Sequence, residues 1–170
     1  MGIFGLIDAS KSNLKRHLTR NKGIHGSVVI YIGGMAELFL SSRDEERLYL
    51  KKRKGFIKLG LTTPGVDVIP IYLFGNTSVL TVLTHGFLAN ISRKLKISLT
   101  LFWGKWGLPI PRDEKLLYVS GQPLGLPDIP NPTQEDIDKW HDKYCQEVTR
   151  IFNTYKERVP MYKHKTLVIV

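Results

Sequence analysis

The clearest pattern in the chain is a helical stripe of apolar residues near the C-terminus. From Ile137 to Tyr155, apolar side chains recur at spacings of three and four residues, with charged residues between them. That period places them on one face of a helix. Thr133 precedes the stripe and is followed by Glu135 and Asp136, which suits the positive end of a helix. We therefore predict a long helix that begins after Thr133 and packs its aromatic face into the core.

Three short runs rich in β-branched residues, each ending in a glycine-containing turn, predict strands at residues 27–32, 66–74 and 116–119. The first two are almost wholly apolar, as strands covered on both faces are. Between them we predict a helix opened by a capping box of Ser42 and Glu45. Pro70 indicates an edge or a bulge in the second strand. Strands alternating with helices favour an α/β fold with a mainly parallel sheet flanked by helices.

The length and charge of the chain indicate its number of domains and the kinds of partner it could bind. At 170 residues it fits one domain, residues 1–170, and a single cysteine excludes an internal disulfide framework. The net charge is +10, and residues 1–110 hold 16 Lys and Arg against 6 Asp and Glu. This asymmetry favours an anionic partner, such as nucleic acid, phospholipid headgroups or a phosphorylated ligand, although solubility alone would also explain it. The longest apolar stretch, residues 66–89, is interrupted by polar residues, glycine and proline, so no window predicts a transmembrane helix.

A glycine pair after the first predicted strand is a candidate ligand site. In open α/β sheets ligands bind beyond the carboxyl ends of strands, where paired glycines let backbone amides approach them. Gly33 and Gly34 occupy that position, and Glu37 follows three residues later, where its carboxylate would orient a polar substrate. A tight turn with a solvated Glu37 is the alternative interpretation.

A basic run at residues 51–54, followed by Gly55, is a second candidate site. We predict it at the C-terminal end of the preceding helix, where some of its cations would complement the helix dipole. Four consecutive cations cover the whole circumference of a helix, so at least two of them face solvent or an anion. Phosphate groups of a ligand or a membrane surface would suit them.

Other aromatic and titratable residues carry weaker signals. Trp103 and Trp106 flank Lys105 in a segment broken by glycine and proline, which suits either a membrane-interface position or an ordinary buried loop. His25 and His85 are potential general bases by type, but neither has a recognisable partner nearby in the sequence. No group of residues has the spacing of a metal site, and no Ser-nucleophile or nucleotide-binding motif occurs.

Taken in order, four blocks of sequence resemble the type 2 diacylglycerol acyltransferase family, which also includes monoacylglycerol and wax-ester acyltransferases. The blocks are GGMAELF at 33–39, RKGFIKLGL at 53–61, GVDVIPIYLFGN at 65–76 and VSGQPLGLPDIPNPTQEDIDKWHDKY at 119–144. The resemblance implies an acyltransferase-like α/β fold and transfer of a fatty acyl group from acyl-CoA to a glyceride hydroxyl in triacylglycerol synthesis. It implies acyl-CoA as co-substrate with no bound cofactor, diacylglycerol or a related acceptor, and a place on the cytosolic face of the endoplasmic reticulum membrane or on lipid droplets.

The resemblance also implies binding roles for particular residues of this chain. Gly33, Gly34 and Glu37 would contact the acyl group or the acceptor, and the block of Arg53, Lys54 and Gly55 would face the coenzyme A phosphates. No catalytic residue is carried over, because the family's His-Pro-His-Gly block is absent. The chain therefore resembles the C-terminal portion of the family domain, incomplete on its N-terminal side.

An inactive truncated paralogue is the alternative to an active enzyme. Such a protein would bind the membrane, form a homo-oligomer or pair with a full-length acyltransferase. Nucleic acid is not an expected partner, because the sequence has no base-stacking platform and no zinc signature.

Overall fold

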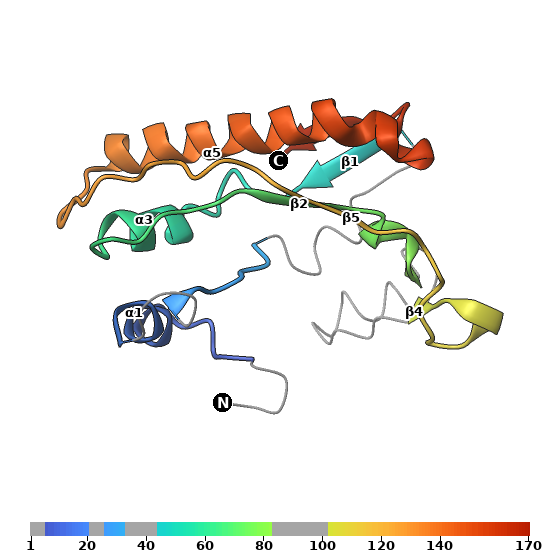
Figure 1. Ribbon diagram of the computed structural model, residues 1–170, viewed down its shortest axis with the longest axis horizontal. Coiled ribbons are helices and arrows are strands. Elements are labelled where there is room, and N and C mark those ends of the chain that lie inside the picture. Colours follow the sequence, from blue (N-terminus) through green and yellow to red (C-terminus); the bar gives the residue numbers. More distant parts are fainter. Residues whose placement is uncertain (1–5, 21–25, 33–43, 83–101) are drawn as a thin grey trace, which may run out of the picture.

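The computed structural model describes residues 6–20, 26–32, 44–82 and 102–170 of the chain. The helices and strands, in chain order, are α1 (Lys11–Arg20), β1 (Glu45–Leu48), α3 (Gly55–Leu61), β2 (Ile71–Phe74), β3 (Thr81–Val82), β4 (Phe102–Trp103), β5 (Leu117–Ser120), α5 (Gln134–Tyr155) and β6 (Thr166–Ile169). Figure 1 shows α5 lying along one side of β1, β2 and β5, with α1 and the 26–32 segment on the other side. Among these described helices, none is both long and apolar enough to cross a bilayer.

The long C-terminal helix is confirmed, and its first turn has the predicted cap. Thr133 Oγ1 accepts a hydrogen bond from the Asp136 N–H at 3.1 Å, and Asp136 Oδ2 accepts one from the Thr133 N–H at 2.9 Å. This reciprocal capping box satisfies two backbone donors that have no partner inside the helix. The apolar face of α5 is buried as predicted, with Ile151 and Phe152 fully enclosed.

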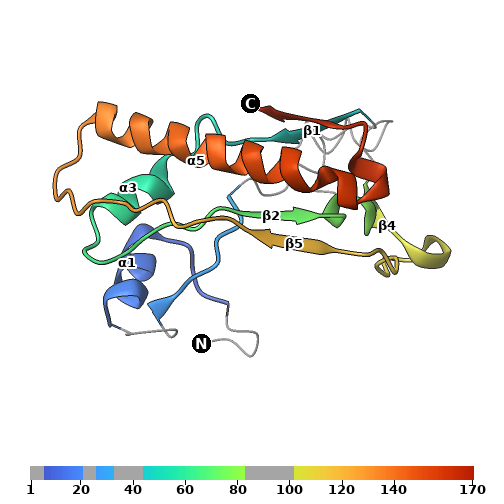
Figure 2. The same cartoon turned by 45° about the horizontal axis from the view of Figure 1, so that its top comes forward.

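The core lies between α5 and the strands beneath it (Figure 2). The Phe152 ring stacks on Phe74 of β2 with ring centroids 5.8 Å apart, and it meets the edge of Tyr72 at 5.4 Å. Tyr162, from a short 3₁₀ turn after α5, closes the same cluster against Phe74 at 5.2 Å. Aromatic pairs at these distances add to the free energy gained from burying their surface.

The strands form three two-stranded pairings rather than one extended sheet. β1 pairs with β6 in parallel, whereas β2 pairs with β5 and β3 pairs with β4 in antiparallel register. The mixed helix and strand content agrees with the predicted α/β class. The mainly parallel arrangement is not confirmed, because only one of the pairings among the described residues is parallel. The backbone N–H of Arg112 donates to the Val79 carbonyl at 2.9 Å, so the chain comes back to a point just beyond the C-terminal end of β2. From there β5 runs antiparallel to β2.

The helix predicted to open at Ser42 and Glu45 is wrong for the part that the structure describes. Glu45–Leu48 is strand β1, hydrogen-bonded to β6 from the far end of the chain. Glu46 is the one buried residue of the strand, and Leu50, just beyond it, is also enclosed. Pairing with a distant strand has overridden the local capping signal.

The strand predicted at 27–32 is also wrong. These residues belong to no assigned strand, and Tyr31 is 82% exposed, so the segment is not covered on both faces. The second predicted strand is shorter than expected and begins at Ile71, immediately after Pro70. Proline has no N–H to donate to a ladder, although its carbonyl accepts a hydrogen bond from the Gly121 N–H at 2.8 Å. The third strand is confirmed with a shift of one residue.

Candidate functional site

A groove of about 1080 Å³ lies mainly between residues 26–32 and the strands β1 and β2, and it reaches Tyr144 and Val148 of α5. Side chains alternate along β2: Tyr72 and Phe74 are buried beneath α5, so Ile71 and Leu73 face the other way. Tyr118 of β5 is the register partner of Leu73 and shares that face. The opposite wall comes from residues 26–32, and together these elements give the groove a largely apolar lining.

The basic run at residues 51–54 forms a turn, called the basic turn below, that lies beside this groove. Residues 51–53 are exposed cations between β1 and α3, and the two residues that bracket the turn, Leu50 and Phe56, both line the groove. The Arg53 guanidinium lies 5.6 Å from the centroid of the ring of Tyr49, the residue that follows β1, at the distance of a cation–π contact. Three positive charges therefore stand next to an apolar groove.

The turn precedes a helix rather than ending one. Lys54 is the N-cap residue of α3, and Gly55 is the first residue of that helix. The expectation that these cations complement a helix C-terminus is therefore wrong, because they lie at the positive end of α3. A Cβ added to Gly55 would meet nothing within 4 Å, so the space beside the turn is open.

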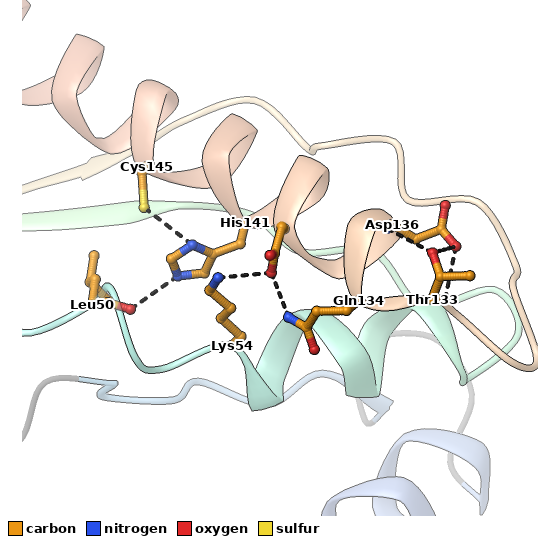
Figure 3. A network of polar contacts seen from close by, with 8 residues as sticks. Leu50, Lys54, Thr133, Gln134, Asp136, His141 and Cys145 are labelled. Carbon is orange, nitrogen blue, oxygen red and sulfur yellow. Dashed lines mark hydrogen bonds and ion pairs between the residues drawn. The ribbon is translucent and has the colours of Figure 1, made fainter.

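Two contacts from α5 fix the position of the turn (Figure 3). Lys54 Nζ forms an ion pair with Asp138 Oδ1 at 2.8 Å, and the amide of Gln134 donates to the same oxygen at 2.6 Å. The hydrogen bond from Lys54 is the main cause that lowers the pKa of Asp138. Lys54 is thus engaged by the protein itself, whereas residues 51–53 remain exposed.

The second contact runs through a buried histidine. His141 Nε2 lies 3.0 Å from the carbonyl oxygen of Leu50, and His141 Nδ1 lies 3.8 Å from Cys145 Sγ. Burial lowers the pKa of His141, so the ring is neutral at neutral pH. A neutral ring can donate to Leu50 only from Nε2, which leaves Nδ1 to accept from the Cys145 thiol.

The hydrogen bond between His141 and Leu50 therefore holds α5 to the start of the basic turn. The contact between His141 and Cys145 does not supply a nucleophile. Burial also raises the pKa of Cys145, which disfavours the reactive thiolate. Among the residues that the structure describes, no group of three or more His, Cys, Asp or Glu side chains could hold a metal ion.

A buried polar cluster that the sequence did not predict lies in the wall of the groove. Glu46 Oε1 accepts from Lys165 Nζ at 2.6 Å and from Thr77 Oγ1 at 3.2 Å. Thr77 Oγ1 in turn lies 3.2 Å from the Tyr162 hydroxyl, which accepts from the Gly75 N–H at 3.0 Å. Burial and the nearby Glu46 carboxylate raise the pKa of Tyr162. The cluster ties β1, β6 and the end of β2 together.

One signal for this cluster was present in the sequence. Glu46, Leu48 and Leu50 occupy alternate positions, which places Glu46 in the apolar phase of a strand. A carboxylate in that phase needs a buried partner, but the partner, Lys165, is 119 residues away and no local pattern identifies it.

The other predicted site lies outside the described residues. Gly33, Gly34 and Glu37 fall in that part of the chain, as do His25 and His85, so their roles stay predictions. Arg53, Lys54 and Gly55 lie together as a consecutive block must.

Of the two interpretations of the tryptophan segment, the buried loop is wrong for Trp106. Its side chain is 84% exposed, at the tip of the turn that follows β4. Trp103 is part of β4 itself and is half-buried.

Comparison with known proteins gives a consistent result over the whole chain. Residues 1–170 match the family model described as diacylglycerol acyltransferase. The chain is 34% identical to diacylglycerol O-acyltransferase 2 of Danio rerio, in an alignment that covers 97% of the chain and 49% of the relative. It is 33% identical to acyl-CoA wax alcohol acyltransferase 2 of Mus musculus, over 98% of the chain and 53% of the relative. The chain thus spans about half the length of the curated relatives it matches. No solved structure matches it.

Proposed function

Because the chain belongs to the diacylglycerol acyltransferase family, we propose that it serves acyl-CoA-dependent transfer of a fatty acyl group to a glyceride hydroxyl. The product class would be triacylglycerol or a related neutral lipid. We place this activity on the cytosolic face of the endoplasmic reticulum membrane or on lipid droplets, with acyl-CoA as co-substrate and no bound cofactor.

The observation that supports the proposal is the basic turn beside the apolar groove. Acyl-CoA combines a long apolar chain with a nucleotide that carries several phosphate charges. The groove offers the chain a lining of aliphatic and aromatic side chains, and the exposed cations of residues 51–53 offer the phosphates charge-assisted contacts. Because Leu50 and Phe56 line the groove on either side of the turn, one ligand can occupy both.

The transfer itself also requires a proton acceptor. The acceptor hydroxyl attacks the thioester carbonyl, its proton passes to a base, and coenzyme A leaves as the thiol after it takes up a proton. Of the three histidines that the structure describes, His141 is held by Leu50 and Cys145, and neither His17 nor His164 lines the groove. In this proposal the described residues bind the substrate, and the proton acceptor is sought outside them.

Binding of oleoyl-CoA to the purified protein tests the role of the basic turn. Replacing residues 51–53 together with Gln should weaken binding about tenfold, from three exposed charge contacts of roughly 0.5 kcal/mol each. The matched control is Lys11→Gln, Lys15→Gln and Arg20→Gln, which removes the same charge from exposed cations on α1 that do not line the groove. Equal losses in the two triple variants would show that only net charge matters and would overturn the site.

The role of the groove is tested by varying acyl chain length. Each methylene that enters an apolar site contributes about 0.8 kcal/mol, so affinity should rise about fourfold per methylene from hexanoyl-CoA to decanoyl-CoA. Equal affinity for acetyl-CoA and oleoyl-CoA would exclude the groove as the acyl site.

Transfer is measured in vesicles with radiolabelled oleoyl-CoA and diacylglycerol, beside a Glu37→Ala variant. Product above the vesicle background, lost in the variant, would establish an active enzyme that depends on Glu37. Tight acyl-CoA binding without product would instead favour the alternative, a paralogue that binds substrate, membrane or a full-length acyltransferase without catalysing transfer.

A further inference from the structure

The turn after β4 has a backbone conformation that its sequence does not favour. Trp106 has φ 55° and ψ 22°, and Gly107 also has a positive φ of 74°. The Leu108 N–H donates to the Lys105 carbonyl at 2.9 Å, which closes a turn of the type I′ pattern. Both central residues of such a turn are left-handed, so Asn, Asp and Gly are strongly preferred there.

A tryptophan at the first central position is therefore not explained by the turn. A left-handed conformation is unfavourable for a bulky side chain, and it persists only where the surroundings impose it. Core packing does not explain it either, because the Trp106 side chain is among the most exposed of those that the structure describes. The exposed indole points to a contact outside the protein.

The surrounding structure holds the turn in one shape. The Gly104 N–H donates to the Leu108 carbonyl at 2.7 Å, and the Lys105 N–H donates to the Ile110 carbonyl at 2.8 Å. A Cβ on Gly104 would overlap the Ile110 carbonyl oxygen, so only glycine permits this close approach. The Arg112 guanidinium braces the base of the loop through a 2.8 Å hydrogen bond to Thr81 Oγ1. A loop fixed in this way presents its side chains without a large ordering cost on binding.

The side chains that it presents are those of a membrane interface. Leu108 and Ile110 are exposed beside Trp106, and Lys105 Nζ lies 5.9 Å from the centroid of the indole ring. Tryptophan with a neighbouring lysine suits the boundary between acyl chains and headgroups, because each has an apolar body and a polar tip. Figure 1 shows this segment projecting from the molecule at the end opposite α1.

We propose that the loop 104–110 inserts into the headgroup region of an anionic phospholipid bilayer, with Trp106 as its anchor. The net charge of +10 complements such a surface. This inference rests on the membrane location given under the proposed function, and it adds the element that makes the contact.

Tryptophan fluorescence tests the anchor directly. In a Trp103→Phe, Trp140→Phe background, Trp106 is the remaining indole, and its emission should shift to shorter wavelength when vesicles of phosphatidylcholine and phosphatidylserine are added. Lipids brominated near the headgroup should quench it. Co-sedimentation of the protein with the same vesicles measures binding separately.

The variant Trp106→Asn separates binding from folding. Asparagine suits the left-handed position, so the melting temperature should stay the same or rise, while the vesicle partition coefficient should fall about tenfold. The control is Leu6→Asn, which removes another exposed apolar side chain near the N-terminus and should leave partition unchanged.

The outcomes distinguish the loop from the membrane location. Sedimentation with vesicles without a change in Trp106 emission would retain the membrane location and overturn the loop. Absence of sedimentation would overturn both. A shift that depends on protein concentration and not on lipid would overturn the proposal in favour of a contact between two copies of the chain.

Discussion

The ion pair between Glu46 and Lys165 gives the sharpest test of how the groove wall is held together. Their side chains are 3% and 12% exposed, and Lys165 Nζ lies 2.6 Å from Glu46 Oε1. Replacing Lys165 with Met keeps an unbranched side chain, one atom shorter, but leaves a carboxylate buried without its counter-ion. Breaking a buried pair from one side costs about 3–5 kcal/mol, because the remaining charge keeps its desolvation penalty.

The same reasoning predicts recovery in a double variant. Lys165→Met combined with Glu46→Gln removes both charges, while the Gln amide oxygen can still accept from the Thr77 hydroxyl. The free energy of unfolding should then lie within about 1–2 kcal/mol of the original protein, since replacing a buried pair as a whole is often neutral. The two substitutions are therefore strongly non-additive, as contacting charges are.

Urea-induced unfolding of the four proteins at neutral pH measures this cycle. In thermal unfolding, the loss in Lys165→Met corresponds to a melting temperature lower by about 6–20 °C for a chain of this size. A cost below about 1 kcal/mol in Lys165→Met, or additive effects in the double variant, would refute the reasoning and would mean that water reaches the pair.

Three further predictions concern α5 and its contacts. Burial lowers the pKa of His141, so its stabilising contribution is complete above the unfolded value near 6.5 and is lost as the pH falls below it; urea unfolding between pH 5 and 8 should show this slope, and His141→Gln should reduce it. Because burial raises the pKa of Cys145, its thiol should react with a disulfide reagent at pH 8 more slowly in the folded protein than in urea. Thr133→Ala should reduce the free energy of unfolding by about 1 kcal/mol through loss of the cap, whereas Thr133→Ser should largely preserve it.

The parts of the fold that the sequence predicts are those with local causes. The boundaries of α5 follow from a cap and an apolar period, both contained within the helix and the residue that precedes it. β1 was predicted as a helix because its strand character depends on pairing with Thr166–Ile169, which the local pattern does not contain. The 27–32 segment has the composition of a buried strand, but composition does not specify a partner strand, and the segment forms one wall of a groove instead.

The candidate site likewise has some features that the sequence predicts and others that only the structure shows. The cations of the basic turn are evident in the sequence, and so is their suitability for phosphate. Their position before α3, and the hold of Asp138 and His141 on the turn, required the structure. The groove could not be predicted, because its walls come from segments that are far apart along the chain.

The groove also indicates where a catalytic base must be sought. Two carboxylates line it, and both are already engaged: Glu46 pairs with Lys165, and Asp67 accepts backbone hydrogen bonds from Gly125 and Leu126 at 2.9 and 3.1 Å. Among the described residues no histidine lines the groove, so for the proposed acyl transfer the search for a base turns to residues outside the described ones. Ile32 lines the groove and is followed in the chain by the segment from Gly33 to Glu37, which makes Glu37→Ala the first substitution to assay.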